Sequence, residues 1–234
     1  MNNDSEFDTY LFLGSKKIII SICSKKNFRI IHLKEIELIN NNNFSSFDDL
    51  DIFLKENIFK IEKTLKKFIK NIYLIIQNIE FFNVQISIKK NIYEDFITKD
   101  TLVHLLNDAK DQCKKTLNEK KIIHMLIDNY HINNRDYSYL PEQIKSSNLC
   151  LDIRFICLPK SYIKSLEKVL KKYQISLSQI ISADYVLNFF NKENSNLFFK
   201  SSRIIAGYNK NEVRLVSKTN KNKGFFEKFF DFFG

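Results

Sequence analysis

The first forty residues alternate between short apolar runs and polar turns. Apolar runs rich in β-branched residues occupy 10–13, 17–23 and 28–38, and the tripeptide Gly-Ser-Lys at 14–16 separates the first two. β-Branched residues favour extended backbone, and short polar turns join antiparallel strands. The pattern therefore predicts an antiparallel meander of three strands.

A long amphipathic helix is predicted over 47–70. Apolar residues recur there every three or four positions with lysines between them, which is the spacing of one helix face. A break in this helix is expected near Asn57. Two strands follow at 72–76, which is a continuous apolar run, and at 84–88, where apolar and polar residues alternate.

From residue 98 onward the sequence pattern predicts alternating helices and strands with longer polar connections. The predicted elements are a helix at 101–117, strands at 121–133 and 149–158, a helix from Pro159, a strand at 176–181 and a helix at 183–191. Proline fits the first turn of a helix, which favours a helix start at Pro159. This order of helix, strand, strand, helix and strand predicts a small α+β unit inserted after the first sheet.

The last part of the chain contains two candidate strands, at 197–206 and 212–217. The turn between them, 207–211, reads Gly-Tyr-Asn-Lys-Asn, which suits a hairpin. The pattern predicts a hairpin over 196–217, followed by a polar linker at 218–223. The compact part of the chain is expected to end there.

The C-terminal tail has a strongly two-sided pattern. At 100° per residue, six phenylalanines fall within an arc of about 160° of a helix; they are Phe225, Phe226, Phe229, Phe230, Phe232 and Phe233. Three lysines of the linker, Lys218, Lys221 and Lys223, stand beside this apolar face. The pattern predicts an interfacial helix that binds anionic lipid. The alternative is a last core helix that packs on its own domain.

Composition and charge narrow the function classes. The chain has 234 residues, 44% of them hydrophobic, which is enough for a sizeable core. No run approaches the roughly 20 apolar residues that span a bilayer, and residues 1–8 do not resemble a signal peptide, so we expect a cytoplasmic protein. The net charge of +10 suits an anionic membrane or nucleic acid, and the basic residues are concentrated near the C-terminus.

The sequence shows no set of residues that would form a catalytic or metal site. The four cysteines lack metal-ligand spacing, and the four histidines complete no such pattern. We therefore expect buried or ordinary surface roles for them, with no metal, no cofactor and no enzymatic activity. Nucleic-acid binding is a further alternative, but it needs exposed aromatic residues among lysines, and the aromatic residues here lie in apolar runs.

Several segments resemble the bacterial cell-division protein family FtsA, an actin-like family. The segment 11–17 is similar to the first phosphate loop of that family, and 70–76 is similar to its helix-to-strand passage. The segment 98–181 resembles its inserted subdomain, and 196–217 resembles the hairpin that opens its second actin-like half. The resemblance implies a partial actin-like, ribonuclease H-like sheet-and-helix domain: a first subdomain at 1–97 completed by 182–195, the insert at 98–181, a vestigial hairpin at 196–217, and a membrane helix at 218–234.

Both phosphate loops depart from the family pattern. Phe12 stands where the family has an aspartate that organises the cation, and Phe cannot coordinate a metal, whereas Gly14 and Ser15 of that loop are kept. In the second loop, Lys200, Ser201 and Ser202 stand where the family has acidic residues and glycines that let backbone amides approach phosphate. We therefore expect no binding of ATP at either loop.

The resemblance implies a division adaptor of the septal ring, held on the cytoplasmic face of the inner membrane by its tail. The implied partners are anionic lipid, other cell-division proteins of the divisome and further copies of the chain. Binding to FtsZ would need another surface, because the subdomain that receives FtsZ in relatives is absent. A second interpretation is a tethered actin-like subunit of a pilus or secretion assembly, whose inner-membrane proteins share this architecture.

Overall fold

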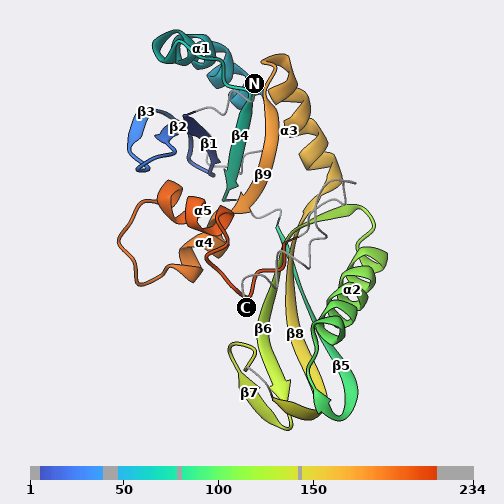
Figure 1. Cartoon of the computed structure of the whole chain (residues 1–234). Helices are drawn as coiled ribbons and strands as arrows, with labels where there is room; N and C mark the ends of the chain where they lie inside the picture. Colours follow the sequence, from blue (N-terminus) through green and yellow to red (C-terminus); the bar gives the residue numbers. More distant parts are fainter. Residues whose placement is uncertain (1–5, 39–46, 78–80, 142–143, 215–234) are drawn as a thin grey trace, which may run out of the picture. The chain divides into compact units, whose positions relative to one another are not determined.

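The computed structural model divides the chain into two compact units (Figure 1). Unit 1 comprises Met1–Phe81 and Pro159–Tyr208, and unit 2 comprises Phe82–Leu158 and Asn209–Gly234. The structure describes residues 6–38, 47–77, 81–141 and 144–214. The chain therefore passes from unit 1 to unit 2, returns to unit 1 at Pro159, and enters unit 2 again at Asn209.

Unit 1 is built on a five-stranded sheet. Its strand order is β3-β2-β1-β4-β9, in which β1 and β2 and also β2 and β3 are antiparallel, whereas β4 is parallel to both β1 and β9. The strands are β1 (Phe7–Leu13), β2 (Lys17–Ser24), β3 (Ile30–Glu37), β4 (Asn71–Ile76) and β9 (Ser176–Ser182). The predicted meander and the two later strands of this sheet are confirmed.

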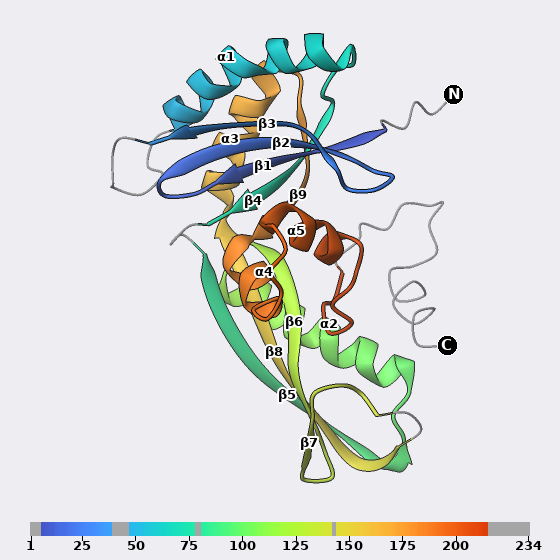
Figure 2. The same ribbon diagram turned by 90° about the vertical axis from the view of Figure 1, so that its left-hand side faces the viewer.

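Helices cover both faces of this sheet (Figure 2). On one face lie α1 (Phe47–Leu65) and α3 (Lys160–Lys172), which contact each other, and on the other face lie α4 (Ala183–Phe189) and α5 (Leu197–Ile205). The apolar stripe of α1 is buried as its spacing predicts. The expected break near Asn57 is wrong: the helix runs through this residue, whose buried side-chain amide donates to the Phe53 carbonyl at 2.8 Å.

Unit 2 is a four-stranded sheet with one long helix on one face (Figure 1). The strand order is β5-β8-β6-β7, and the elements are β5 (Phe82–Phe96), α2 (Lys99–Thr116), β6 (Lys120–Ile132), β7 (Arg135–Tyr137) and β8 (Lys145–Pro159). The Thr98 hydroxyl caps α2 by accepting a hydrogen bond from the Thr101 N–H.

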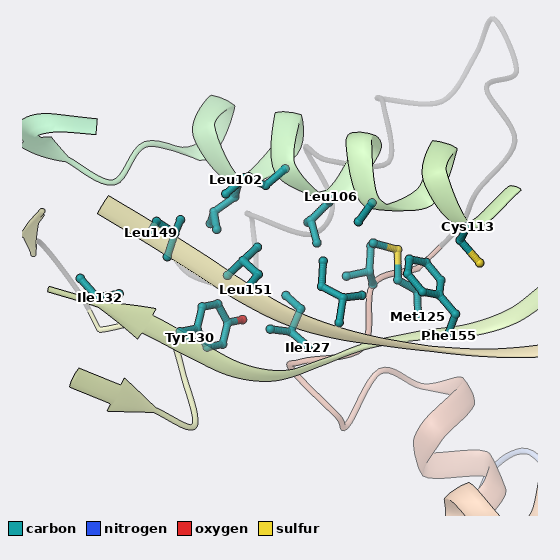
Figure 3. Packing of buried hydrophobic residues seen from close by; sticks show 14 of the residues in the cluster. Leu102, Leu106, Cys113, Met125, Ile127, Tyr130, Ile132, Leu149, Leu151 and Phe155 are labelled. Carbon is teal, nitrogen blue, oxygen red and sulfur yellow. The ribbon is translucent and has the colours of Figure 1, made fainter. Parts of the chain in front are cut away.

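The core of unit 2 lies between α2 and the sheet (Figure 3). Leu102 and Leu106 of the helix face the strand residues Ile127 and Leu151, and all four are almost fully buried. Because side chains alternate across a strand, the residues between these apolar positions lie on the opposite face of the sheet. That second face is where the polar side chains of unit 2 collect.

A short return segment after α5 joins the sheet of unit 2. The Val213 N–H donates to the Met125 carbonyl at 2.8 Å, and the Ile127 N–H donates to the Asn211 carbonyl at 2.9 Å, so this segment lies antiparallel beside β6. The buried ring of His124 also lies 2.6 Å from a carboxylate oxygen of Glu212. The stretch 209–214 is therefore part of unit 2.

The boundaries of the insert differ from the predicted 98–181. The predicted first subdomain at 1–97 includes β5, but this strand pairs with β8 of unit 2 over most of its length. In the other direction, α3 and β9 belong to unit 1, because β9 pairs with β4. The insert therefore spans 82–158, and the first subdomain is completed by 159–208 rather than by 182–195.

The predicted hairpin over 196–217 is also wrong. Residues 197–205 form α5, whose N-terminus is capped by Asn196 accepting a hydrogen bond from the Phe199 N–H at 2.8 Å. Aromatic and β-branched residues suggested a strand, but Phe198, Ser201 and Ile204 recur every three positions and bury one helix face. The asparagine cap was the signal that the strand interpretation missed.

Candidate functional site

The turn after β1 is closed by its own residues. The Gly14 N–H donates to the Lys17 carbonyl at 2.9 Å, which makes the segment a hairpin turn between β1 and β2. The ring of Phe12, only 6% exposed, lies so close to Gly14 that a Cβ at this glycine would be 2.6 Å from a ring carbon. The Gly14 amide, which a phosphate loop would offer to a phosphate, is therefore bonded to the Lys17 carbonyl, and the surface beside Gly14 is covered by the Phe12 ring.

A cavity of about 500 Å³ lies beside this turn. Its lining consists of Phe12, Gly14, Ser15, Lys16, Lys17, Glu37, Leu38 and Gln77. Glu37 is the only carboxylate among these lining residues, so they lack the paired carboxylates that usually hold Mg²⁺ with phosphate oxygens. Throughout the described part of the chain, no group of three or more His, Cys, Asp or Glu residues is placed to hold a metal.

The second predicted loop, at Lys200, Ser201 and Ser202, is part of α5. The Lys200 N–H donates to the Asn196 carbonyl at 3.1 Å, and the Ser202 hydroxyl donates to the Phe199 carbonyl at 2.7 Å. Lys200 and Ser201 are buried in unit 1. Backbone amides inside a helix are already hydrogen bonded, so this segment does not form a phosphate-binding loop.

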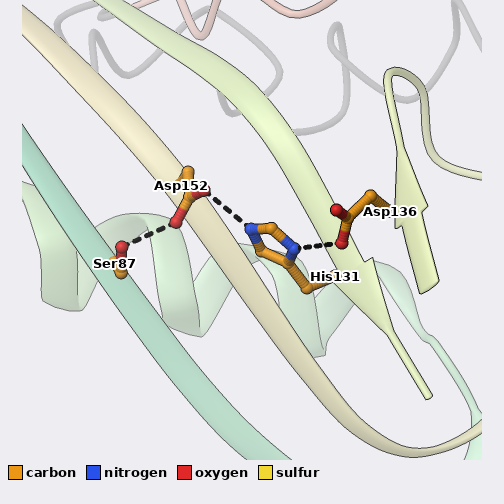
Figure 4. A network of polar contacts seen from close by, with 4 residues as sticks. All are labelled: Ser87, His131, Asp136 and Asp152. Carbon is orange, nitrogen blue, oxygen red and sulfur yellow. Dashed lines mark hydrogen bonds and ion pairs between the residues drawn. The ribbon is translucent and has the colours of Figure 1, made fainter. Parts of the chain in front are cut away.

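A hydrogen-bond network of four polar side chains crosses all four strands of unit 2 (Figure 4). The sequence did not predict it. His131 of β6 lies between two carboxylates: its Nε2 is 2.7 Å from Asp152 of β8, and its Nδ1 is 2.6 Å from Asp136 of β7. Ser87 of β5 donates its hydroxyl hydrogen to Asp152 at 2.6 Å. These side chains lie on the sheet face opposite α2.

The charges in this network reinforce one another. Hydrogen bonds that His131 donates to Asp152 and then to Asp136 raise the pKa of His131, and hydrogen bonds that Asp152 accepts from Ser87 and then from His131 lower the pKa of Asp152. The Ser87 hydroxyl donates to the Asp152 carboxylate rather than to the imidazole, and the lowered pKa of Asp152 makes this carboxylate a weak base. The network therefore stabilises the charged forms of His131 and Asp152 and links the four strands. Its order of serine, aspartate, histidine and aspartate differs from the serine, histidine and aspartate order of a catalytic triad.

A second ion pair continues this polar face. Arg154 of β8 makes a two-pronged contact with Asp128 of β6, at 3.1 Å from Nε and 2.8 Å from Nη2. Asp152 and Arg154 alternate in sequence with the buried Leu151 and Ile153. That alternation in 149–158 was the available signal that one face of this strand is polar and accessible to a partner.

The cysteines make no disulfide and, as predicted, serve chiefly as small buried side chains. Cys23, Cys113 and Cys157 are buried and Cys150 is half-buried, and all four are free thiols. Burial, followed by the neighbouring Cys113, raises the pKa of Cys157 to about 12. A thiol held this far from ionisation is a poor nucleophile, because the thiolate is the reactive form.

The predicted membrane-binding residues lie outside the described residues. They are Lys218, Lys221, Lys223, Phe225, Phe226, Phe229, Phe230, Phe232 and Phe233. The tail helix therefore stays a prediction. Within the described residues, none of the helices combines the length and the apolar character that a bilayer span requires.

Comparison with known proteins places the fold. No protein-family profile matches the chain, and no curated protein matches it either. Among solved structures, a chain of the PilM-PilN type IV pilus biogenesis complex aligns with 79% of this chain at a TM-score of 0.50 and 9% identity. The chain has a partial actin-like fold. This confirms the predicted fold class of a partial actin-like domain.

Two further solved structures align less well. One is the cytoplasmic domain of EpsL, an inner membrane component of the type II secretion system of Vibrio cholerae, with a TM-score of 0.39, 10% identity and 77% of this chain covered. The other is a Bacteroides thetaiotaomicron protein with an actin-like ATPase fold and unknown function, with a TM-score of 0.34, 14% identity and 80% covered. This chain spans 49%, 58% and 56% of the lengths of the three solved chains.

Proposed function

We propose that this chain is a non-enzymatic, actin-like subunit of a multiprotein assembly at the cytoplasmic face of the bacterial inner membrane, of the pilus or secretion type. The observation that carries the proposal is the closed first loop: the actin-like sheet is kept, while the Gly14 N–H is bonded to the Lys17 carbonyl and the Phe12 ring packs against Gly14. Such a protein acts through contacts rather than through turnover.

The fold likeness supports the choice of assembly. The solved chain that aligns over 79% of this chain belongs to a complex of two pilus-biogenesis proteins, PilM and PilN. Unit 2 has a surface that suits protein contacts, because the sheet face that bears His131 and Arg154 is polar and is not covered by α2. Polar, partly exposed networks of this kind provide specificity and orientation in protein interfaces.

A cell-division adaptor is the second candidate. The resemblance to FtsA on the first loop and on 70–76 favours it, and the actin-like sheet with an insert is compatible with it. Its implied contacts, with division proteins and other copies of the chain, would be made at the septum. None of the three solved structures described above names FtsA or cell division.

Depletion of the protein in its native cell distinguishes the two candidates. We expect cells to lose surface filaments or secreted proteins while they still divide at normal length. Long, unseptated cells with intact filaments and secretion would instead support the division adaptor. Complementation with the full chain is the control, because it must restore whichever phenotype is lost.

Nucleotide binding tests the non-enzymatic part of the proposal. We expect Mg²⁺ and ATP to leave the thermal unfolding temperature of the full chain unchanged, because a ligand that binds only the native state would raise it. A rise that grows with ATP concentration would overturn the proposal that the first loop is closed. A depletion experiment without a phenotype would not affect this measurement. The assembly assignment and the absence of nucleotide binding are therefore tested separately.

A further inference from the structure

A second cavity of unit 1 lies at the opposite end of the sheet from the closed loop. Its volume is about 460 Å³, within the usual range for small-ligand sites. It is lined by the start of β1, including Asp8 and Thr9, and by Asn71 at the start of β4. The loop at Gly14 follows the other end of β1, so this cavity is not the phosphate site of actin-like ATPases.

Lysines dominate the charge of this cavity. The segment that joins α1 to β4 contributes Lys66, Lys67 and Lys70, and Lys25 follows β2. Lys66 adopts a left-handed φ of 53°, which turns the chain at the end of α1. Asp8 is the only carboxylate among the lining residues.

Among the described residues, two of these four lysines form an ion pair and two do not. Lys25 lies 3.8 Å from Asp8, and Lys67 lies 3.2 Å from the highly exposed Glu6. Lys66 and Lys70 make no ion pair with any residue that the structure describes. Burial raises the pKa of Asp8 although Lys25 lies beside it, which indicates that the cavity is partly shielded from water and that charge interactions are strengthened there.

An apolar cavity adjoins the basic one. It lies against α1 and the end of α3, has a volume of about 470 Å³, and shares Phe68 and Lys70 with the basic cavity. Phe68 is 78% exposed and Phe59, which lines the apolar cavity, is 72% exposed. Two phenylalanines this exposed, next to unpaired lysines, are unusual for a surface that meets only water.

We propose that this surface binds an anionic phospholipid, with its phosphate among Lys66, Lys67 and Lys70 and its acyl region against Phe59 and Phe68. Ammonium groups complement the negative headgroup, and aromatic side chains at such sites enter the boundary between headgroups and acyl chains. This gives unit 1 a membrane contact of its own, separate from the predicted tail helix. The contact does not depend on which assembly the protein serves.

A tryptophan reporter tests the proposal directly. The chain contains no Trp, so Phe68→Trp introduces a single indole at the rim shared by both cavities. We expect its emission to shift to shorter wavelength with phosphatidylglycerol vesicles and to stay unchanged with phosphatidylcholine vesicles. The measurement is repeated in a full-length variant in which all six tail phenylalanines are replaced by serine, so that the apolar face of the tail does not bring the indole to the membrane. No shift in that variant would overturn the proposal.

Matched charge variants show whether the cavity or only the net charge matters. Lys66→Gln/Lys70→Gln in the reporter chain should weaken vesicle binding by about tenfold or more, since a lysine near an anionic surface contributes on the order of 1 kcal/mol. The control Lys114→Gln/Lys115→Gln removes the same charge from exposed positions of α2 and should change binding by less than about twofold. Equal losses in both pairs would overturn the site. Circular dichroism verifies that each variant is folded.

Inorganic phosphate distinguishes a lipid from a soluble ligand. If phosphate alone shifts the emission of the reporter and phosphatidylglycerol vesicles do not, the cavity takes a soluble phosphate ester and the lipid assignment is wrong. If vesicles shift the emission and phosphate does not, the acyl contacts at Phe59 and Phe68 are required, as proposed. Phe59→Ser should then reduce vesicle binding without affecting the fold, because this side chain is largely exposed.

Discussion

The ring of Phe12 lies directly against Gly14, at the place where a side chain on this glycine would stand. A Cβ there would be 2.6 Å from one ring carbon and 2.8 Å from another, both closer than real Cβ contacts. A side chain at position 14 would therefore clash with the ring of Phe12. The position of the Phe12 ring therefore explains why residue 14 is a glycine.

Substitutions at these two positions should be coupled. Gly14→Ala should lower the free energy of unfolding by about 1–3 kcal/mol, because the methyl group overpacks against the ring. In a Phe12→Leu background the same change should cost less than about 0.5 kcal/mol, since the ring atoms are gone. Urea unfolding of the four chains of this double-mutant cycle measures the coupling. An equal cost in both backgrounds would show that the ring is not the obstacle.

The stability of unit 2 should depend on pH through His131 and Asp152. The pKa of His131 is raised from 6.5, so its contribution is complete below pH 6.5 and is lost as the pH rises through the folded value. The pKa of Asp152 is lowered from 3.8, so its contribution is complete above pH 3.8 and is lost as the pH falls through the folded value. The pair of His131 and Asp152 therefore stabilises the folded state of unit 2 most between pH 3.8 and 6.5.

Comparison of the wild type with His131→Gln measures this effect. The difference in unfolding free energy should reach about 0.5–1 kcal/mol in that window, because the side chains are about one-third exposed and solvent screens them, and it should shrink above it. His32→Gln is the control, since His32 forms no ion pair with the residues described here. A difference that does not change with pH would contradict the assigned pKa directions.

Glu212 should hold the return segment on unit 2. Glu212→Ala removes the carboxylate that is hydrogen bonded to the buried ring of His124, which should cost about 1–3 kcal/mol. The amide hydrogens of Val213 and Ile127, which bond across this segment, should then exchange faster. Glu119→Ala at an exposed position should change stability by less than about 0.5 kcal/mol. Unchanged exchange in Glu212→Ala would mean that backbone pairing alone holds the segment.

The C-terminal phenylalanine face should bind membranes. We expect the full chain to sediment with phosphatidylglycerol liposomes more strongly than a chain that ends at Asn222, because six phenylalanines and the adjacent lysines suit an anionic surface. Liposomes of phosphatidylcholine are the control for charge. Equal sedimentation of both chains would assign the tail to a core or a protein partner instead.

Local pattern was enough to predict most elements. The β-branched runs at 10–13 and 17–23 became β1 and β2, and the apolar stripe beginning at Leu50 became the buried face of α1, because these periods are set by the geometry of the backbone itself. Where local signals conflicted, prediction failed: α5 has strand-like residues but a helical spacing and an asparagine cap.

The sequence by itself determined the type and approximate extent of most elements, because each depends on neighbours within a few residues. Tertiary structure alone decided which sheet each strand joins, so β5 pairs with β8 rather than with unit 1. It also brought together residues far apart in the chain, such as Ser87, His131 and Asp152, and Lys25 with Lys66. Such pairings depend on long-range packing and strand register, which periodicity within one segment does not encode.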